Sequence, residues 1–219
     1  MEIEGSGHKV MLLHGFSKNK KDMMELQANL SRHHFACMPI DLPLTFKSIE
    51  HCAVVLEGIF DGLVPALKTG EKISLVGHSS GGLVIRKFLS DTKHLDRVNK
   101  CILIATPNQG SELADFLAKV SRTGVKIFKT LESIRGKSVR HLNMKETDVK
   151  VGVIAGNNSN LLLGKLLKGD NDGRVTVESV YFDGMYDFIV LPYGHKDIHY
   201  RKETADLIRK FIASSKFKL

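Results

Sequence analysis

The chain has 219 residues, a length that fits one compact domain or at most two small ones. Hydrophobic residues make up 42% of it and charged residues 26%, a balance typical of globular proteins that excludes the disordered and collagen-like classes. Lysine and arginine outnumber aspartate and glutamate by 32 to 24, and the resulting net charge of +8 brings nucleic-acid and anionic-lipid partners into consideration.

Short apolar runs alternate with longer amphipathic stretches along the chain. The predicted strands are Lys9–Leu13, Phe35–Ile40, Lys72–Val76, Cys101–Ala105, Val149–Ala155 and Phe188–Leu191. The predicted helices are Lys20–Ser31, Ile49–Leu67, Gly81–Leu89, parts of Ser111–Met144, and Glu203–Ile212. Continuously apolar strands separated by helices predict an α/β fold, in which a mostly parallel central sheet has helices on both faces.

Two segments interrupt this alternation. Ser111–Lys150 holds roughly forty residues where an α/β unit needs far fewer, so part of it must form an extra element. The second segment, 157–170, contains the apolar-rich stretch Leu161–Leu167. Both segments fit either helices packed on the core or a lid over a site. We expect a single domain over residues 1–219, with a short helical cap inserted within 111–150 and an irregular loop at 157–170.

The termini and cysteines carry little functional information. No apolar run approaches the roughly 18–20 residues of a membrane helix, and Met1–Gly7 lacks the pattern of a secretory signal, so we expect a cytoplasmic protein. The three cysteines, Cys37, Cys52 and Cys101, are odd in number and have no metal-ligand spacing. They are expected to be reduced, buried thiols.

A Gly-x-Ser-x-Gly pattern occupies Gly77–Gly81, where a predicted strand passes into a predicted helix. A sharp turn there would strain the backbone of Ser79 and project its side chain outward, while the flanking glycines let neighbouring backbone approach closely. The start of the following helix would also stabilise developing negative charge. Ser79 is therefore the candidate nucleophile. The alternative is a glycine-rich turn whose serine caps a helix.

A serine nucleophile needs a base and an acid that orients the base. Asp170 and Asp172 lie in the segment Gly169–Val175, one helix and loop after the strand Val149–Ala155. We favour Asp172 as the acid because Asp172-Gly173 forms its own turn, and an Asx-turn without catalytic duty is the alternative. Asp170 could be a surface residue or an ion ligand and is left unassigned.

Two histidines, His195 and His199, follow the last predicted strand. His195 lies in the first turn of the loop, after Gly194, where a base can reach back to the strand ends, so we expect it to be the base. His199 lies one helical turn later and is expected to face solvent or the following segment. Their spacing does not predict zinc, because a metalloprotease glutamate and a third ligand are missing. No metal site is expected.

Together these motifs resemble the α/β-hydrolase superfamily, specifically its small lipase- and esterase-like members. The matching pieces are Leu13–Phe16, Gly77–Gly82, Ala105–Ser111, Asn171–Val175 with Glu178-Ser179 behind it, and Gly194-His195. The resemblance implies a nucleophile elbow at Ser79 and the order Ser, Asp, His for the triad. It also implies an oxyanion hole formed by the backbone N–H groups of Phe16 and Ser80. His14 is expected to hold the oxyanion loop through its ring.

We therefore expect a serine hydrolase that cleaves small-molecule carboxylic esters through Ser79, His195 and Asp172, with no metal and no organic cofactor. An acyltransferase or thioesterase with the same triad, and a non-catalytic binding module of the same fold, remain alternatives. Residues 111–150 carry 9 basic and 5 acidic side chains, and residues 195–219 carry 7 and 3.

No nucleic-acid-binding motif accompanies this charge, so no nucleic-acid partner is expected. The charge then fits a solvated surface, or weak attraction of a basic cap to anionic lipid or an acidic substrate. The oligomeric state does not follow from the sequence.

Overall fold

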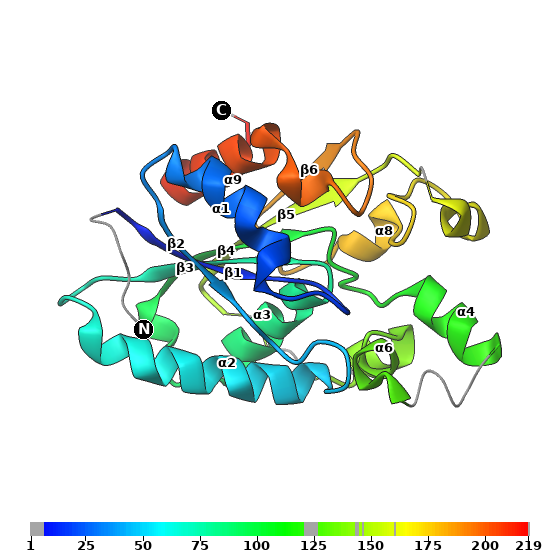
Figure 1. Cartoon of the computed structure of the whole chain (residues 1–219), viewed down its shortest axis with the longest axis horizontal. Coiled ribbons are helices and arrows are strands. Elements are labelled where there is room, and N and C mark those ends of the chain that lie inside the picture. The colour runs from blue at the N-terminus through cyan, green and yellow to red at the C-terminus, as the bar shows by residue number, and fades with distance from the viewer. Residues whose placement is uncertain (1–6, 121–126, 143–144, 146, 160, 219) are drawn as a thin grey trace.

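Six strands form a single parallel sheet in the order β2-β1-β3-β4-β5-β6 (Figure 1). The computed structural model describes residues 7–120, 127–142, 145, 147–159 and 161–218. The strands are β1 (Lys9–Leu13), β2 (Ala36–Ile40), β3 (Ile73–His78), β4 (Val98–Ile104), β5 (Lys150–Gly156) and β6 (Asp187–Leu191). Every pair of neighbouring strands is parallel, which confirms the α/β fold class predicted from the sequence.

Helices cover both faces of the sheet (Figure 1). On one face lie α1 (Met24–Ser31) and α9 (Lys202–Ser214), and on the other α2 (Ile49–Leu63) and α3 (Ser80–Asp91). Successive side chains of a strand point to opposite faces. In β1, Val10 and Leu12 accordingly pack with α1 and α9, whereas Met11 and Leu13 pack with α2 and α3. Each strand needs apolar residues throughout because both faces of the sheet are covered.

Shorter elements fill the connections. They are η1 (Lys20–Met23), η2 (Val64–Ala66), η3 (Leu95–Arg97), α4 (Glu112–Val120), α6 (Lys129–Ser133), α7 (Gly136–Arg140), η4 (Leu162–Leu166), α8 (Val177–Val180) and η5 (Ile198–Tyr200). The predicted helical segment 111–144 contains α4, α6 and α7, while 121–126 and 143–144 lie outside the described residues. Residues 1–6, and residue 160 of the loop 157–170, also lie outside them.

Strand β4 starts three residues earlier than the apolar run predicted, at Val98. Two of the three extra residues, Asn99 and Lys100, are polar, but their side chains find partners in the fold. Asn99 donates to the hydroxyl of Ser74 at 3.2 Å, and Lys100 donates to the carbonyl of Ile212 at 2.6 Å. Periodicity alone cannot find such a strand end because its polar groups are paired by residues distant in sequence.

The strand order places a switch point between β1 and β3. The chain runs from β1 outward to β2, returns to the other side of β1 as β3, and then continues away through β4, β5 and β6. In open α/β sheets, ligands bind beyond the carboxyl ends of the strands at such a point. The loops after β1 and β3 lie against each other at this point. A Cβ added to Gly15 would lie only 3.0 Å from the Cβ of Ser79.

The three cysteines are free thiols, with Cys52 and Cys101 buried and Cys37 partly buried. Burial raises the pKa of the Cys37 and Cys52 thiols to about 12, so both remain protonated at neutral pH. Across the part of the chain that the structure describes, no helix combines the length and apolar character needed to span a bilayer.

Candidate active site

The turn between β3 and α3 holds Ser79 in a strained conformation, with φ at 54° and ψ at −126°. Such a backbone costs a non-glycine residue on the order of 1–3 kcal/mol and persists only when its surroundings fix it. The Ser79 N–H donates to the carbonyl of Ile104 at 2.8 Å. A Cβ at Gly81 would lie 2.5 Å from the carbonyl oxygen of His14, so only glycine allows this close packing.

One imidazole contacts both Ser79 and Asp172. The His195 Nε2 atom lies 3.1 Å from the Ser79 Oγ, and its Nδ1 atom lies 2.7 Å from the Asp172 Oδ2. The His195 N–H also donates to the carbonyl of Asp172 at 2.8 Å. Asp172 is fully buried and His195 is 3% exposed. The structure thus brings together the three residues that the sequence analysis selected.

The loop around Asp172 fixes the direction of its carboxylate. The Oδ1 atom accepts hydrogen bonds from the backbone N–H groups of Arg174 at 2.9 Å and Val175 at 2.8 Å. The Oδ2 atom is thereby left facing His195. Asp170 is exposed, and its carbonyl accepts the N–H of Val177 instead. Of the two candidate acids, Asp172 is the one in contact with the imidazole.

The segment Ala105–Ser111 holds the acid loop in place. Asn108 donates from its side chain to the carbonyl of Val180 at 2.7 Å, and the Gln109 N–H donates to the carbonyl of Ser179 at 2.9 Å. Both acceptors lie in α8, directly after the acid loop. Arg86 in turn donates to the carbonyl of Asn108 at 3.2 Å. The Thr-Pro-Asn motif therefore connects the strand after the nucleophile to the segment that carries Asp172.

His14 holds the loop after β1, as expected. Its Nε2 atom accepts the N–H of Leu42 at 3.1 Å, so the proton resides on Nδ1, which donates to the carbonyl of Gly15 at 2.9 Å. The ring is fully buried. His14 thereby fixes the backbone just before Phe16, one of the two residues expected to donate to an oxyanion.

A cavity of about 60 Å³ opens beside Ser79 and His195. It is lined by Gly15, Phe16, Lys18, Asp22, His78, Ser79, Arg174, His195, Lys196 and His199. A water molecule occupies about 30 Å³ of liquid volume, so the cavity is suited to small groups at the point of reaction. The larger part of a substrate would lie outside it.

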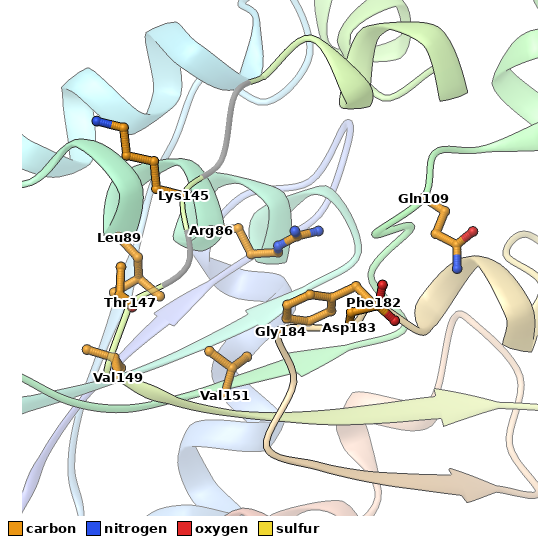
Figure 2. A pocket seen from close by; sticks show the side chains of 10 residues that line it. All are labelled: Arg86, Leu89, Gln109, Lys145, Thr147, Val149, Val151, Phe182, Asp183 and Gly184. Atoms are coloured by element: carbon orange, nitrogen blue, oxygen red, sulfur yellow. The ribbon is translucent and has the colours of Figure 1, made fainter.

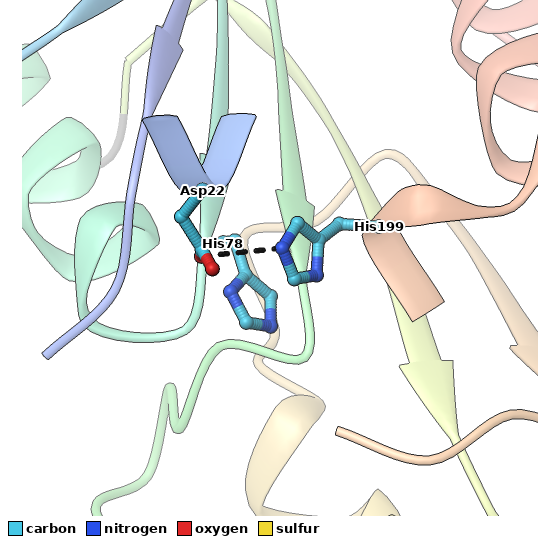
Figure 3. Close-up of side chains that lie close together, drawn as sticks. All are labelled: Asp22, His78 and His199. Carbon is cyan, nitrogen blue, oxygen red and sulfur yellow. Dashed lines mark ion pairs between the residues drawn. The ribbon is translucent and has the colours of Figure 1, made fainter. Parts of the chain in front are cut away.

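His199 corrects the sequence analysis, which expected this side chain to face solvent or the following segment. It is 1% exposed, and its Nε2 atom lies 3.2 Å from the Oδ2 of Asp22 (Figure 3). Its ring stacks on that of His78 with centroids 3.8 Å apart and 20° between the planes. The short helix η5 turns His199 inward, and Tyr200 in the same helix donates to the Asp22 Oδ1 at 2.7 Å.

The sequence analysis missed this second cluster of Asp22, His78 and His199. His78 is visible in the Gly-x-Ser-x-Gly motif as the residue before the nucleophile, but Asp22 lies in η1 with no motif around it. Burial lowers the pKa of His199 and lowers that of His78 well below its usual value. Burial opposes ionisation of Asp22, yet contacts with His199 and Tyr200 outweigh it and hold its pKa below the usual range.

A separate cavity of about 390 Å³ lies between α3, β5 and the loop 182–184 (Figure 2). Arg86 projects into it, with its guanidinium 4.0 Å from the centroid of the Phe182 ring. Burial lowers the pKa of Arg86 to about 10, so the side chain remains charged. None of Ser79, His195 and Asp172 lines this cavity. Size alone therefore does not mark the reactive site in this molecule.

The comparison with protein families identifies the chain. The model of the alpha/beta hydrolase fold family matches residues 9–128, more than half of the sequence, and the chain belongs to that family. The matched region contains the loop after β1, the turn at Ser79 and the Thr-Pro-Asn motif. No curated protein gives a significant sequence match.

Solved structures share the fold at low sequence identity. The mature lipase BlEst2 of Bacillus licheniformis has a TM-score of 0.78 at 19% identity, with 97% of this chain and 93% of that chain covered. The metagenomic carboxyl esterase MGS0156 has a TM-score of 0.72 at 14% identity, covering 98% and 78%. Est1E from Butyrivibrio proteoclasticus, solved with ferulic acid bound, has a TM-score of 0.60 at 14% identity, covering 94% and 88%. At these identities the likeness shows the fold alone.

Proposed function

We propose that the protein is a serine hydrolase that cleaves carboxylic esters. The observation that carries this proposal is the pair of contacts made by His195, at 3.1 Å to the Ser79 Oγ and 2.7 Å to the Asp172 Oδ2. A serine hydroxyl is too weakly acidic to attack a carbonyl at neutral pH without an adjacent base. An imidazole held by a buried carboxylate supplies that base in the correct tautomer and orientation.

The reaction follows from this geometry in two halves. Ser79 Oγ attacks the ester carbonyl while its proton passes to His195 Nε2, and the resulting imidazolium is stabilised by the Asp172 carboxylate. His195 then gives this proton to the leaving alcohol, and an acyl-enzyme remains on Ser79. A water molecule loses a proton to His195 and attacks the acyl carbonyl. The tetrahedral intermediate collapses, the carboxylic acid leaves, and the proton returns to Ser79.

We further propose that the N–H groups of Phe16 and Ser80 stabilise the oxyanion of each tetrahedral intermediate. Ser80 is the first residue of α3, whose amino-terminal N–H groups have no partner within the helix. Phe16 follows Gly15, which packs against Ser79 and is held through His14. Removing one donor from an oxyanion hole typically costs about 10²–10³-fold in kcat.

The segment 111–150 is proposed to cap the site. At the amino-terminal end of α6, the ring of Phe128 lies edge-on to Phe16 at 6.1 Å and stacks with Phe46 at 5.8 Å between centroids. The Thr130 hydroxyl donates to the carbonyl of Lys47 at 2.6 Å. These contacts connect the inserted helices to the oxyanion loop and to the start of α2, so an aromatic wall borders the reaction point.

Weak contact with anionic lipid is proposed for the same region. Phe46, Phe116 and Val120 are 58%, 44% and 71% exposed, and the segment 111–150 carries a net basic charge. Apolar side chains beside lysines favour an anionic membrane surface. Vesicles of phosphatidylcholine with phosphatidylserine should retain the protein at low salt and release it as salt rises. Retention that does not depend on salt would contradict an electrostatic contact.

The experiment that tests the enzyme is labelling with a fluorophosphonate, followed by mapping of the modified peptide by mass spectrometry. We expect a single adduct on Ser79 and loss of both labelling and p-nitrophenyl butyrate hydrolysis in Ser79→Ala. The matched control is Ser31→Ala, which changes an exposed serine on α1. Hydrolysis retained by Ser79→Ala, or an adduct on another residue, would refute the proposal.

The same residues would serve an acyltransferase or a thioesterase. Product analysis in the presence of competing alcohol and thiol acceptors distinguishes these reactions, because a hydrolase releases free acid whereas a transferase accumulates the new ester or thioester. Faster turnover of an acyl thioester than of the matched oxygen ester would reassign the substrate class. Neither outcome would change the roles of Ser79, His195 and Asp172.

A further inference from the structure

The cluster of Asp22, His78 and His199 contains buried atoms without hydrogen-bond partners. Among the described residues, no hydrogen-bond partner is found for the His78 Nδ1 or the His199 Nδ1, whereas the Asp22 Oδ2 and the His199 Nε2 face each other as an ion pair at 3.2 Å. His78 is 5% exposed and His199 is 1% exposed. Leaving a buried polar atom without a partner costs free energy, and each such atom in a native structure calls for an explanation.

The hydrogen bonds made by the other polar atoms of these side chains show which ring nitrogen carries the proton and which carries a lone pair. The His78 Nε2 lies 3.0 Å from the carbonyl oxygen of His195, which only accepts, so Nε2 carries the proton and Nδ1 carries a lone pair. The Asp22 Oδ1 accepts from the Tyr200 hydroxyl at 2.7 Å and lies 3.2 Å from the Lys18 Nζ. These contacts match those around metal ligands, whose second polar atom is usually held by a carbonyl or another partner.

The protonation states in the cluster also fit a cation. A metal ion binds neutral imidazole and ionised carboxylate. Burial lowers the pKa of both histidines and favours the neutral rings. Contacts with His199 and Tyr200 hold the pKa of Asp22 low despite its burial, and this favours the carboxylate.

We propose that Asp22, His78 and His199 form a binding site for a zinc-like transition-metal ion beside the nucleophile. One ligand atom from each residue can be chosen so that all three lie within 4.8 Å of one another (Figure 3). Two nitrogen ligands with one oxygen ligand suit Zn²⁺ and Co²⁺ better than Mg²⁺ or Ca²⁺, which prefer oxygen ligands. A water or substrate atom would complete four-coordination.

Binding requires the side chains of the cluster to move. Metal–ligand distances of about 2.0–2.2 Å place neighbouring ligand atoms roughly 3.3–3.6 Å apart in a tetrahedron. The Asp22 Oδ2 and His199 Nε2 already lie 3.2 Å apart. The stacked rings of His78 and His199 must splay so that their in-plane lone pairs converge on one point. The positive charge of Lys18 repels a bound cation, but the Lys18 side chain is 50% exposed and can turn into solvent.

The position of the site predicts its effect on the reaction. This consequence rests on the proposed hydrolase function, whereas binding does not. His78 donates to the carbonyl of His195, and the centroids of their rings lie 4.9 Å apart. The cluster lines the same 60 Å³ cavity as Ser79. Turning His78 toward an ion would disturb the backbone of the proposed base, so metal should inhibit hydrolysis.

The primary test measures binding on the Ser79→Ala protein, which removes any dependence on activity. Purified protein is stripped with a chelator and titrated with Zn²⁺ by calorimetry, and with Co²⁺ by visible absorption. We expect one equivalent of Zn²⁺ at the cluster, a tetrahedral Co²⁺ spectrum, and no competition from excess Mg²⁺. Titration of the protein with intact Ser79 should inhibit ester hydrolysis, and a chelator should reverse the inhibition.

Two variants and a matched control locate the ion. Asp22→Asn keeps the shape of the side chain and His199→Gln keeps a polar group, and each should weaken Zn²⁺ binding at least about tenfold. The control is His94→Gln in the cluster of Glu57, Asp61 and His94, where Asp61 is exposed and the ligand atoms also lie within 4.8 Å. This change should leave the one-equivalent site intact. Thermal unfolding of each variant verifies that it folds.

The absence of one-equivalent binding by the parent protein would overturn the proposal whether or not the variants fold. Binding that Asp22→Asn leaves unchanged would also overturn it, because the ion would then lie elsewhere. If Zn²⁺ binds as expected but the protein hydrolyses no ester, the metal site stands and the proposed function fails.

Discussion

Among the described residues, two aspartate–histidine pairs with largely buried side chains lie within one small region, and they differ in what the imidazole contacts. In the pair Asp172–His195, the carboxylate and ring nitrogen lie 2.7 Å apart and the second ring nitrogen faces Ser79. In the pair Asp22–His199 the corresponding separation is 3.2 Å, and the ring stacks on His78 instead of facing a hydroxyl. A similar pair of side chains thus has two different surroundings.

The surroundings of the carboxylates explain the difference. Two backbone N–H groups of its own loop fix Asp172, so its free oxygen has one direction. The Oδ1 of Asp22 is held by Tyr200 from a distant segment and by Lys18 four residues before it, and its Oδ2 faces the His199 Nε2. A base that activates a nucleophile requires the first arrangement, whereas the second pairs the carboxylate with an imidazole that stacks on another ring.

The largest expected effect separates the two histidines. His195→Ala should lower kcat by about 10⁶-fold, because loss of the base removes the function of the whole triad. His199→Ala should lower kcat by less than about tenfold, since His199 does not contact Ser79. Both variants would be assayed with p-nitrophenyl butyrate under identical conditions. A larger loss in His199→Ala than in His195→Ala would exchange the roles of the two pairs.

A second effect separates the aspartates of the acid loop. Asp172→Asn should lower kcat by about 10⁴-fold, because an amide does not stabilise the imidazolium and favours the wrong tautomer. Asp170→Asn should leave kcat within about twofold, since its exposed side chain lies outside the contact with His195. Steady-state kinetics of both variants provide the comparison. Equal losses of kcat would show that both substitutions act by disturbing the loop, and would contradict a specific role of the Asp172 carboxylate.

A third effect appears in the dependence of stability on pH. The pKa of His199 is lowered by burial, so the unfolded chain binds its proton more readily than the native state does. Stability should therefore fall as pH drops below the ordinary histidine value of about 6.5, by at most about 1.4 kcal/mol per pH unit for each such histidine. Urea unfolding at pH 7.5 and at pH 5.5 measures this change in the free energy of unfolding. His199→Gln should reduce this dependence, and an undiminished slope would assign it to other groups.

The smallest expected effect concerns the hydroxyl that holds Asp22. Tyr200→Phe removes a 2.7 Å hydrogen bond to the carboxylate and should lower stability by about 1–2 kcal/mol. The corresponding fall in Tm is about 2–8 °C for a chain of this size. Tyr181→Phe, at an exposed position, is the control and should leave Tm unchanged. An equal fall in the Tm of both variants would show that the hydrogen bond from Tyr200 to Asp22 does not stabilise the protein.

The sequence by itself predicted the sheet, its helices and the three residues that lie together at the candidate site. Apolar runs locate the core strands because both faces of the sheet are covered, and Ser79, Asp172 and His195 each sit in a local motif of turns and glycines. In that sense the candidate nucleophile, acid and base are local features. The start of β4 was missed because Asn99 and Lys100 find their partners only in the folded chain.

The surroundings of His199 were decided only by the tertiary structure. Its sequence neighbours indicate an exposed turn, and nothing near Asp22 indicates a partner. In the folded chain η5 carries His199 inward, so that its ring stacks on His78 at the end of β3 and lies against Asp22 of η1. Such a cluster joins three segments distant in sequence, and its chemistry depends on burial and on which atoms remain unpaired. Those quantities exist only once the chain has packed.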